Sequence, residues 1–196
     1  MNLLHYKEYT DEELMLLYQK NSDVKIFDEL VIRYKERIIN FVYKYTNNIS
    51  DAEDLTQDSF IKLYRYRDKY RDVAKFSTWF YTIVINTVRN KYNKEKNYTS
   101  IDIENVSEYE LQTDDFIFTP DENGSDDDHL RRMDCVKRSF DELDDIFKEV
   151  ILLRYNEEFE YEKIAELLNI PEGTVKSRIN RGREHMKNIF VKLYKE

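Results

Sequence analysis

Glycine, proline and cysteine are all scarce in this sequence. Its 196 residues include three glycines and two prolines, and Pro120 and Gly124 lie together in one acidic stretch. Because both residue types interrupt regular structure, their scarcity favours long helices on either side of that stretch. The single cysteine, Cys135, excludes an intramolecular disulfide and fits a reducing cytoplasm. We therefore expect an all-α protein.

Long apolar runs and targeting signals are also lacking. No apolar run approaches the roughly 18 residues that a membrane-spanning helix requires. The first residues, MNLLHYKEYTDEEL, do not have the pattern of a signal peptide. The sequence thus predicts a cytoplasmic protein without a membrane span.

The net charge of -9 is unevenly distributed along the chain. Residues 1–98 carry 17 basic and 15 acidic side chains, and residues 130–196 carry 14 of each. Residues 99–129 carry 11 acidic side chains and neither lysine nor arginine. The acidic excess is confined to the middle, so a nucleic-acid partner for either half is not excluded. We predict domains at 1–98 and 130–196, joined by a flexible acidic linker at 99–129.

Capping residues and hydrophobic spacing predict helices in the first domain. Thr10 and Glu13 form a capping box ahead of a short helix. Apolar residues at three- and four-residue spacing then predict a long amphipathic helix from Asp23 to about Tyr45. Further along, Ser77 or Thr78 is expected to cap a helix that ends in basic residues.

An acidic run, DAEDLTQD at residues 51–58, opens another predicted helix, for which Ser50 and Glu53 supply a capping box. Carboxylates here complement the positive end of the helix dipole, which alone could explain several of them. A carboxylate metal site is a weaker alternative, because the three histidines are scattered. A protein-docking surface is the third. The apolar residues expected to face inward are Leu55, Phe60, Leu63 and Tyr64.

The last predicted helix of this domain starts aromatic and ends basic. The residues concerned are Trp79, Phe80 and Tyr81, then Arg89, Lys91, Lys94 and Lys96. Aromatic rings can stack on unpaired bases while basic side chains follow the phosphates of a single strand. Helical spacing places Trp79, Ile83 and Asn86 on related faces, so one helix can serve both the core and a strand. Core packing is the default role for Trp79.

The second domain contains a helix-turn-helix pattern, after helical patterns at about 130–141 and 143–155. The apolar face of its first helix consists of Ile164, Ala165, Leu167 and Leu168. Residues 169–173 form a tight turn, and Thr174 is expected to cap the second helix. Val175 and Ile179, four residues apart, should anchor that helix against the first.

The free face of this second helix carries hydrogen-bond donors: Lys176, Ser177, Asn180, Arg181 and nearby Arg183. Such donors can reach base edges or phosphates when a helix enters the major groove of DNA. A solvated basic face is the plainer alternative. Gly182 is expected to weaken the helix by about 1 kcal/mol relative to alanine.

Together, these segments resemble the sigma-70 family of bacterial RNA polymerase sigma factors, and within it the extracytoplasmic-function (ECF, group 4) factors that have two conserved domains. The resemblance covers most of residues 20–97 and 130–192. DAEDLTQDSFIKLY is similar to the segment that grips the coiled coil of the polymerase β′ subunit, which overrides the dipole interpretation. The docking residues that the resemblance implies are Asp51, Glu53, Asp54, Leu55, Gln57 and Asp58.

The resemblance also implies two DNA-binding sets. FSTWFYTIVINTVRNKY is similar to the segment that melts the promoter and holds a flipped base of the -10 element, which Asn86 would do here. This set comprises Lys75, Phe76, Trp79, Asn86, Arg89, Asn90 and Lys94. YEKIAELLNIPEGTVKSRINRGRE is similar to the family's reader of the -35 duplex. That set comprises Thr174, Lys176, Ser177, Arg178, Asn180, Arg181 and Arg183.

As partners the resemblance implies core RNA polymerase (the β′ coiled coil and the β flap), promoter DNA and an anti-sigma factor, which could hold the protein at the membrane. The acidic linker would follow the RNA path of the polymerase. No catalytic centre, cofactor, metal or obligate homo-oligomer is expected. The main rival is a free-standing helix-turn-helix regulator, which would bind duplex DNA without polymerase. An enzyme using the Asp/Glu cluster is a distant third.

Overall fold

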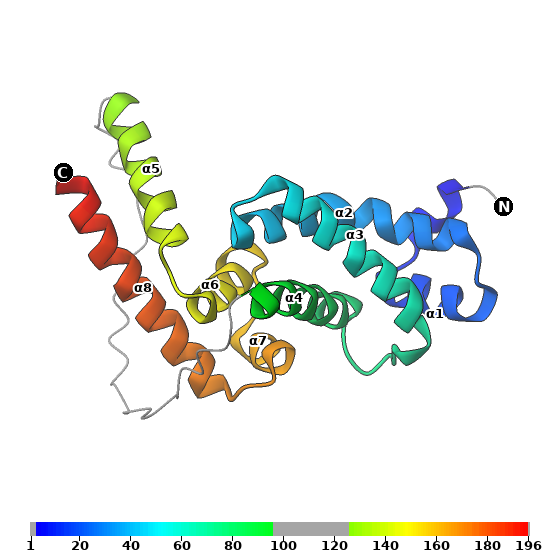
Figure 1. Ribbon diagram of the computed structural model, residues 1–196. Helices are drawn as coiled ribbons and strands as arrows, with labels where there is room; N and C mark the ends of the chain where they lie inside the picture. The colour runs from blue at the N-terminus through cyan, green and yellow to red at the C-terminus, as the bar shows by residue number, and fades with distance from the viewer. Residues whose placement is uncertain (1–2, 96–125, 196) are drawn as a thin grey trace. The chain divides into compact units, whose positions relative to one another are not determined.

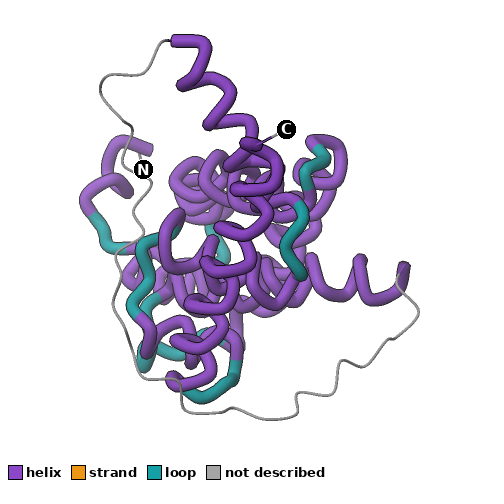
Figure 2. Tube along the Cα trace, turned by 90° about the vertical axis from the view of Figure 1, so that its left-hand side faces the viewer, coloured by secondary structure: helices purple, strands orange, loops and turns teal. Residues whose placement is uncertain are grey.

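The computed structural model describes residues 3–95 and 126–195. Within these ranges all regular structure is helical, which confirms the all-α prediction (Figure 1, Figure 2). The chain divides into two compact units, Met1–Ser100 and Ile101–Glu196. Most of the predicted linker lies outside the described residues, although residues 126–129 of it belong to a helix.

The described part of the first unit has four α-helices and two short 3-10 helices. They are η1 (Leu3–Glu8), α1 (Asp11–Asn21), α2 (Val24–Thr46), α3 (Ile49–Tyr66), η2 (Arg67–Lys69) and α4 (Phe76–Glu95).

The starts of α1 and α2 are as the sequence predicts. The hydroxyl of Thr10 accepts a hydrogen bond at 3.2 Å from the N–H of Glu13, and the Glu13 carboxylate accepts one at 2.8 Å from the N–H of Thr10. Asp23 caps α2 by accepting from the N–H of Lys25 at 2.9 Å. The buried face of α2 follows the predicted spacing, with Leu30, Tyr34, Ile38, Phe41, Val42 and Tyr45.

The predicted capping box of α3 is wrong by two residues. Asn48 is the cap, because its side-chain oxygen accepts from the N–H groups of Ser50 at 3.0 Å and Asp51 at 3.3 Å. Asn47, in a left-handed conformation with φ 52°, ends α2 immediately before it. Two adjacent asparagines thus end one helix and begin the next, and Ser50 lies inside the first turn of α3.

The predicted caps of α4, Ser77 or Thr78, are also wrong. The helix begins at Phe76, whose N–H donates to the carboxylate of Glu12 at 2.8 Å. Glu12 lies on α1, so the start of α4 depends on a residue far away in the sequence. Thr78 is buried and lies inside the first turn, three residues after the cap position.

Aromatic rings from α2, α3 and α4 meet at the centre of the first unit. The ring centroid of Phe80 lies 5.1 Å from that of Phe60 and 5.6 Å from that of Tyr34. Tyr81 meets Phe41 edge-on at 5.3 Å. Full burial of a side chain of this size stabilises the fold by about 1.5–3 kcal/mol. This packing fixes α4 against α2 and α3 while a different face of α4 stays accessible.

The described part of the second unit consists of α5 (Asp126–Asp141), α6 (Asp145–Ile151), a π-helical turn η3 (Leu152–Asn156), α7 (Tyr161–Leu168) and α8 (Glu172–Lys195). Helices α5, α6 and α7 all contact the long helix α8. The helix predicted at about 143–155 is thus observed as α6 continued by η3.

Gly182 has a packing role in addition to its effect on helix propensity. It is buried where α8 crosses α6. A Cβ atom at this position would lie 2.8 Å from Cδ1 of Ile151 and 3.1 Å from Cβ of Phe147. The glycine therefore permits a close approach of the two helices and is more than a weak point of α8.

Candidate docking and nucleic-acid surfaces

The acidic run of α3 lies mainly on an exposed face. Of the predicted docking residues, Glu53, Asp54, Gln57 and Asp58 are exposed. Leu55 is 3% exposed, so it belongs to the core and can only support this face from behind. Asp51 alone of the acidic residues lies in the first turn of α3. Because the dipole effect fades beyond the first turn, it does not explain the other three carboxylates.

Asp51 is engaged inside the domain. Its Oδ1 lies 2.6 Å from Nζ of Lys91, and its Oδ2 accepts a hydrogen bond at 3.1 Å from the hydroxyl of Tyr92. The hydrogen bond from Lys91 lowers the pKa of Asp51, partial burial opposes this shift, and the bond from Tyr92 assists it. Local sequence patterns do not predict this pairing, because Asp51 and Lys91 lie on different helices.

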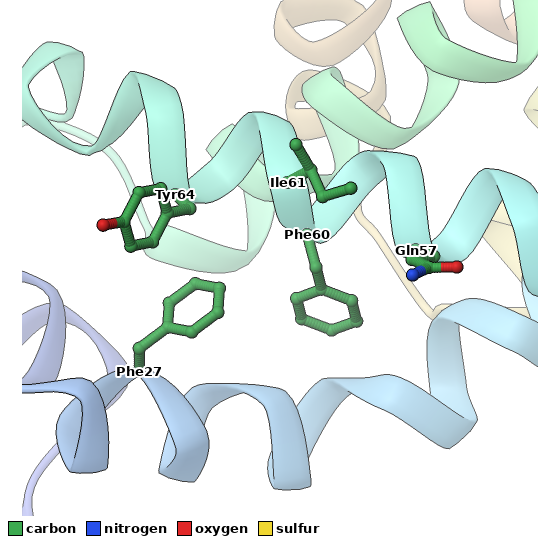
Figure 3. A pocket seen from close by; sticks show the side chains of 5 residues that line it. All are labelled: Phe27, Gln57, Phe60, Ile61 and Tyr64. Carbon is green, nitrogen blue, oxygen red and sulfur yellow. The ribbon is translucent and has the colours of Figure 1, made fainter.

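An apolar groove lies between α2 and α3, beside the acidic face (Figure 3). It has a volume of about 270 Å³ and is lined by Phe27, Gln57, Phe60, Ile61 and Tyr64. The ring of Phe27 lies 5.8 Å from that of Tyr64 and 6.5 Å from that of Phe60. Tyr64 is 48% exposed, so it forms part of the rim and does not face the core as predicted.

This groove and the acidic face share Gln57. Ile61 is 41% exposed, which for a large aliphatic side chain leaves apolar surface available for contact. Neighbouring apolar and acidic surfaces suit a partner that presents apolar side chains flanked by basic ones. Phe27 and Ile61 were not among the predicted site residues, since an apolar residue beside an interface has the same sequence pattern as one in a core.

The accessible face of α4 carries several of the predicted strand-binding residues. Asn86 and Asn90, one turn apart, are exposed, and Arg89 is half-buried. Trp79 is half-buried. The centroid of its ring lies 5.2 Å from that of Tyr70 and 6.2 Å from that of Phe76. Trp79 therefore both packs on the domain and keeps part of its surface accessible, as the dual interpretation of this helix expects.

Three further residues of the strand-binding set lie in different environments. Lys75 is exposed just before α4. Phe76 is fully buried, so it can support Trp79 but cannot itself meet a base. Lys94 lies within α4, and its side chain is outside the described part of the structure.

The helix-turn-helix is present as α7, a short turn and α8. The backbone N–H of Ile170 donates to the carbonyl of Ala165 at 3.1 Å, which closes α7 after Asn169 in its left-handed conformation. Val175 and Ile179 are buried, which confirms that they anchor α8. The buried residues of α7 are Ile164, Leu167 and Leu168.

Thr174 does not cap α8. The helix begins at Glu172, and the N–H groups of Thr174 and Val175 donate to the carbonyl of Pro171 at 2.9 and 3.1 Å. Thr174 is thus already inside the first turn. Proline suits the position before a helix because it has no N–H of its own to satisfy.

The predicted reading residues lie on α8 outside its buried face, which consists of Val175, Ile179 and Gly182. Asn180 and Arg181 are exposed, and Thr174, Ser177, Arg178 and Arg183 are half-buried. Nζ of Lys176 lies 2.6 Å from the carboxylate of Glu172 and 5.7 Å from the ring centroid of Tyr161. Lys176 is therefore held at the start of α8 by a neighbour one turn earlier and by the first residue of α7.

Among the described residues, no group of three or more His, Cys, Asp or Glu side chains is placed to hold a metal ion. No helix in the same part of the chain is long and apolar enough to cross a membrane.

Family models match both units. The model of sigma-70 region 2 matches residues 30–98, and that of sigma-70 region 4 matches residues 133–186. The ECF RNA polymerase sigma factor SigW of Bacillus subtilis (strain 168) is 33% identical over 173 residues, which span 86% of this chain and 90% of that protein. The ECF RNA polymerase sigma-E factor of Escherichia coli (strain K12) is 32% identical over 185 residues, 93% of this chain and 95% of that protein.

Solved structures show the same fold. CnrH, in complex with the cytosolic domain of CnrY, aligns with 91% of this chain and 96% of its own, with a TM-score of 0.65 and 19% identity. The sigma factor RpoE of Bartonella quintana, in complex with the anti-sigma factor NepR, aligns with 84% of this chain and 96% of its own, with a TM-score of 0.59 and 24% identity.

Proposed function

This chain belongs to the sigma-70 family as an ECF sigma factor, an alternative sigma factor that directs transcription initiation, and we propose how its surfaces divide that work. Residues 1–98 form the region 2 domain, which docks on core polymerase and captures the -10 element. Residues 99–129 form an acidic linker. Residues 130–196 form the region 4 domain, which reads the -35 element.

Docking on the β′ coiled coil is assigned to α3. The exposed residues Glu53, Asp54, Gln57 and Asp58 provide an acidic face that attracts a basic partner and sets its orientation. The neighbouring groove between Phe27 and Tyr64 supplies apolar area, which gives binding energy once it is covered. This adjacency of exposed carboxylates and an open apolar groove is the observation that carries the proposal.

Capture of the displaced -10 strand is assigned to α4 and the residues just before it. Partly exposed Trp79 offers a stacking surface, and Asn86 offers a side chain that can hydrogen-bond a flipped base. Arg89 and Lys94 follow the phosphates, with Lys75 on the preceding loop and Asn90 one turn after Asn86.

Reading of the -35 duplex is assigned to α8. Arginine or lysine recognises guanine through two acceptors, and asparagine recognises adenine. Lys176, Asn180 and Arg181 are the residues for which we propose base or adjacent phosphate contacts. Thr174, Ser177, Arg178 and Arg183 complete the surface.

The other proposed partners are those expected of a member of this family. We propose that the region 4 domain also contacts the β flap, that the linker follows the RNA path, and that an anti-sigma factor holds the protein inactive. The protein works in the cytoplasm with the polymerase, and a membrane-bound anti-sigma factor would retain it at the membrane. It has no catalytic centre, cofactor or obligate homo-oligomeric state, because the polymerase performs the chemistry.

The test is in vitro transcription with sigma-free core polymerase on genomic fragments. The wild type is compared with Asp54→Arg and with Lys176→Ala/Arg181→Ala, after circular dichroism has established equal helicity. Glu36→Arg, an exposed charge reversal on α2, controls for the first variant. Lys192→Ala/Lys195→Ala, two exposed lysines near the end of α8, controls for the second.

Specific transcripts should appear with the wild type and both controls. They should vanish with Asp54→Arg and weaken with the double variant of α8. If the wild type gives no specific start with core polymerase while the protein alone shifts duplex DNA, the chain acts as a free-standing regulator and the proposed division of surfaces is wrong.

A further inference from the structure

A polar junction fastens the last turns of α4 to the rest of the first unit. The carboxylate of Asp51 on α3 binds Nζ of Lys91 at 2.6 Å and the hydroxyl of Tyr92 at 3.1 Å. The ring of Tyr92 packs against that of Tyr45 on α2, with the centroids 6.4 Å apart. Tyr45 is itself buried, so three helices meet at this point.

The junction lies just beyond the last buried apolar residues of α4. Among the described residues, Val88 is the last buried apolar side chain of this helix. Arg89, Asn90, Lys91 and Tyr92 are all half-buried or exposed. The end of a helix beyond its core contacts frays readily, because its last carbonyls lack partners and little apolar area holds it. The bonds to Asp51 supply a fixed attachment in this stretch.

The attached stretch includes residues to which strand capture is assigned. Arg89 and Asn90 directly precede Lys91, so the same turn of helix that binds Asp51 carries these two side chains, of which Asn90 is exposed and Arg89 is half-buried. A small movement of that turn would displace both from the path of a bound strand. Binding is tighter when such groups are already ordered, because less conformational entropy is lost on contact.

We propose that Asp51 is a positioning residue for strand capture: by holding Lys91 and Tyr92 it orders the end of α4, so that Arg89 and Asn90 meet the displaced promoter strand. This inference rests on the proposed role of α4. It removes Asp51 from the docking set, since both of its carboxylate oxygens already have partners within the domain. Asp54, one turn later on α3 and exposed, remains a docking residue.

The test uses the full chain and separates two affinities. One is the affinity for core polymerase, and the other is the affinity of the reconstituted holoenzyme for a single-stranded -10 oligonucleotide. The variants are Asp51→Ala, the charge exchange Asp51→Lys/Lys91→Asp, and the matched control Asp54→Ala. Circular dichroism establishes that each variant keeps the helicity of the wild type.

We expect Asp51→Ala to keep core affinity within about twofold and to weaken strand binding about five- to tenfold, the size expected when a contact residue must be ordered on binding. The charge exchange should recover strand binding to within about threefold of the wild type, because it restores an ion pair between the same two helices. Asp54→Ala should show the opposite pattern, with weakened core affinity and unchanged strand binding.

Three results would overturn the inference. If Asp51→Ala weakens core affinity as Asp54→Ala does and leaves strand binding intact, Asp51 is a docking residue. If both affinities fall together and the charge exchange recovers neither, Asp51 has a general structural role. If even the wild-type holoenzyme does not bind the oligonucleotide, the proposed role of α4 fails first, a result distinct from the other two.

Discussion

The carboxylate of Glu12 on α1 accepts a hydrogen bond at 2.8 Å from the backbone N–H of Phe76, the first residue of α4. The first N–H groups of any helix have no partner within the helix, so a side chain elsewhere can serve as the cap. Glu12 thereby sets where the helix assigned to strand capture begins. Phe76 is fully buried beside Trp79, so the same contact helps to fix the position of the tryptophan.

Replacing this cap should destabilise the first unit. For Glu12→Ala we expect a loss of about 1 kcal/mol, the typical cost of removing a capping acceptor. Differential scanning calorimetry of the full chain should show the transition of the first unit about 4–8 °C lower. Glu53→Ala, which removes an exposed carboxylate from α3, is the control and should change the melting temperature little. An unchanged transition for Glu12→Ala would mean that α4 does not need this cap.

The starts of the helices differ in how far they can be predicted from the sequence. The cap at Asp23 and the box of Thr10 with Glu13 were predictable, because cap and helix are adjacent in the chain. The start of α4 was not, because its cap lies 64 residues earlier. At α3 two candidate caps, Asn48 and Ser50, compete within three residues, and the left-handed turn at Asn47 decides between them.

Gly182 offers a direct test of helix packing in the second unit. Alanine favours a helix over glycine by about 1 kcal/mol, so a solvent-facing site would gain stability. Here the added Cβ would lie 2.8 Å from Ile151 and 3.1 Å from Phe147, and overpacking of a core typically costs about 1–3 kcal/mol. We expect Gly182→Ala to be destabilising by about 1 kcal/mol net, measured by denaturant unfolding.

Two variants make the Gly182 result specific. Gly173→Ala is the matched control, because a Cβ there would meet nothing within 4 Å, and it should be neutral or stabilising. Ile151→Val removes the Cδ1 atom nearest to the new methyl group, so adding it to Gly182→Ala should recover part of the loss. If Gly182→Ala is as stable as Gly173→Ala, the close approach of α6 and α8 is not needed.

The stability contributed by Asp51 should depend on pH with a defined sign. The hydrogen bond from Lys91 lowers the pKa of Asp51 in the folded protein below its ordinary value of 3.8. A carboxylate with a lowered folded pKa binds more protons when unfolded, so its contribution is complete above that ordinary value and is lost as pH falls through the folded pKa. Wild type should therefore melt higher than Asp51→Asn at neutral pH, and the two should converge below pH 3.8.

Thermal unfolding of both proteins across this pH range provides the measurement. Asp54→Asn serves as the comparison, since Asp54 is exposed on the same helix. A difference between wild type and Asp51→Asn that persists unchanged into the acid range would show that the carboxylate charge is not what stabilises the junction.

The polar candidate surfaces could be predicted from the sequence and the apolar groove could not, for a physical reason. The exposed acidic residues of α3 and the polar residues of α8 outside its core could be predicted, because charged and amide side chains at helical spacing seldom belong to a core. The groove was not, because Phe27 and Ile61 have the chemistry of core residues. Whether an apolar side chain meets a neighbour or solvent depends on the packing of two helices, which no local pattern specifies.

The pairing of Lys176 bears on DNA affinity. Its Nζ lies 2.6 Å from Glu172, and the side chains are 40% and 47% exposed, so the ion pair contributes only about 0.3–0.5 kcal/mol. To contact DNA, the ammonium group of Lys176 must break its ion pair with Glu172 or bind Glu172 and a phosphate or base at the same time. We therefore expect Glu172→Gln to raise the affinity for duplex -35 DNA about twofold at low salt, and less as the salt concentration rises.

A double-mutant cycle with Lys176→Ala separates the possible causes of that gain, with Glu184→Gln as an exposed control on the same helix. If the gain disappears in the Lys176→Ala background, Glu172 acts by holding the lysine. If the gain is the same in both backgrounds and Glu184→Gln reproduces it, the carboxylate acts only by repelling phosphates. A loss of affinity with Glu172→Gln would contradict the prediction, because it would mean that Glu172 itself accepts a hydrogen bond from a base, as glutamate does from cytosine.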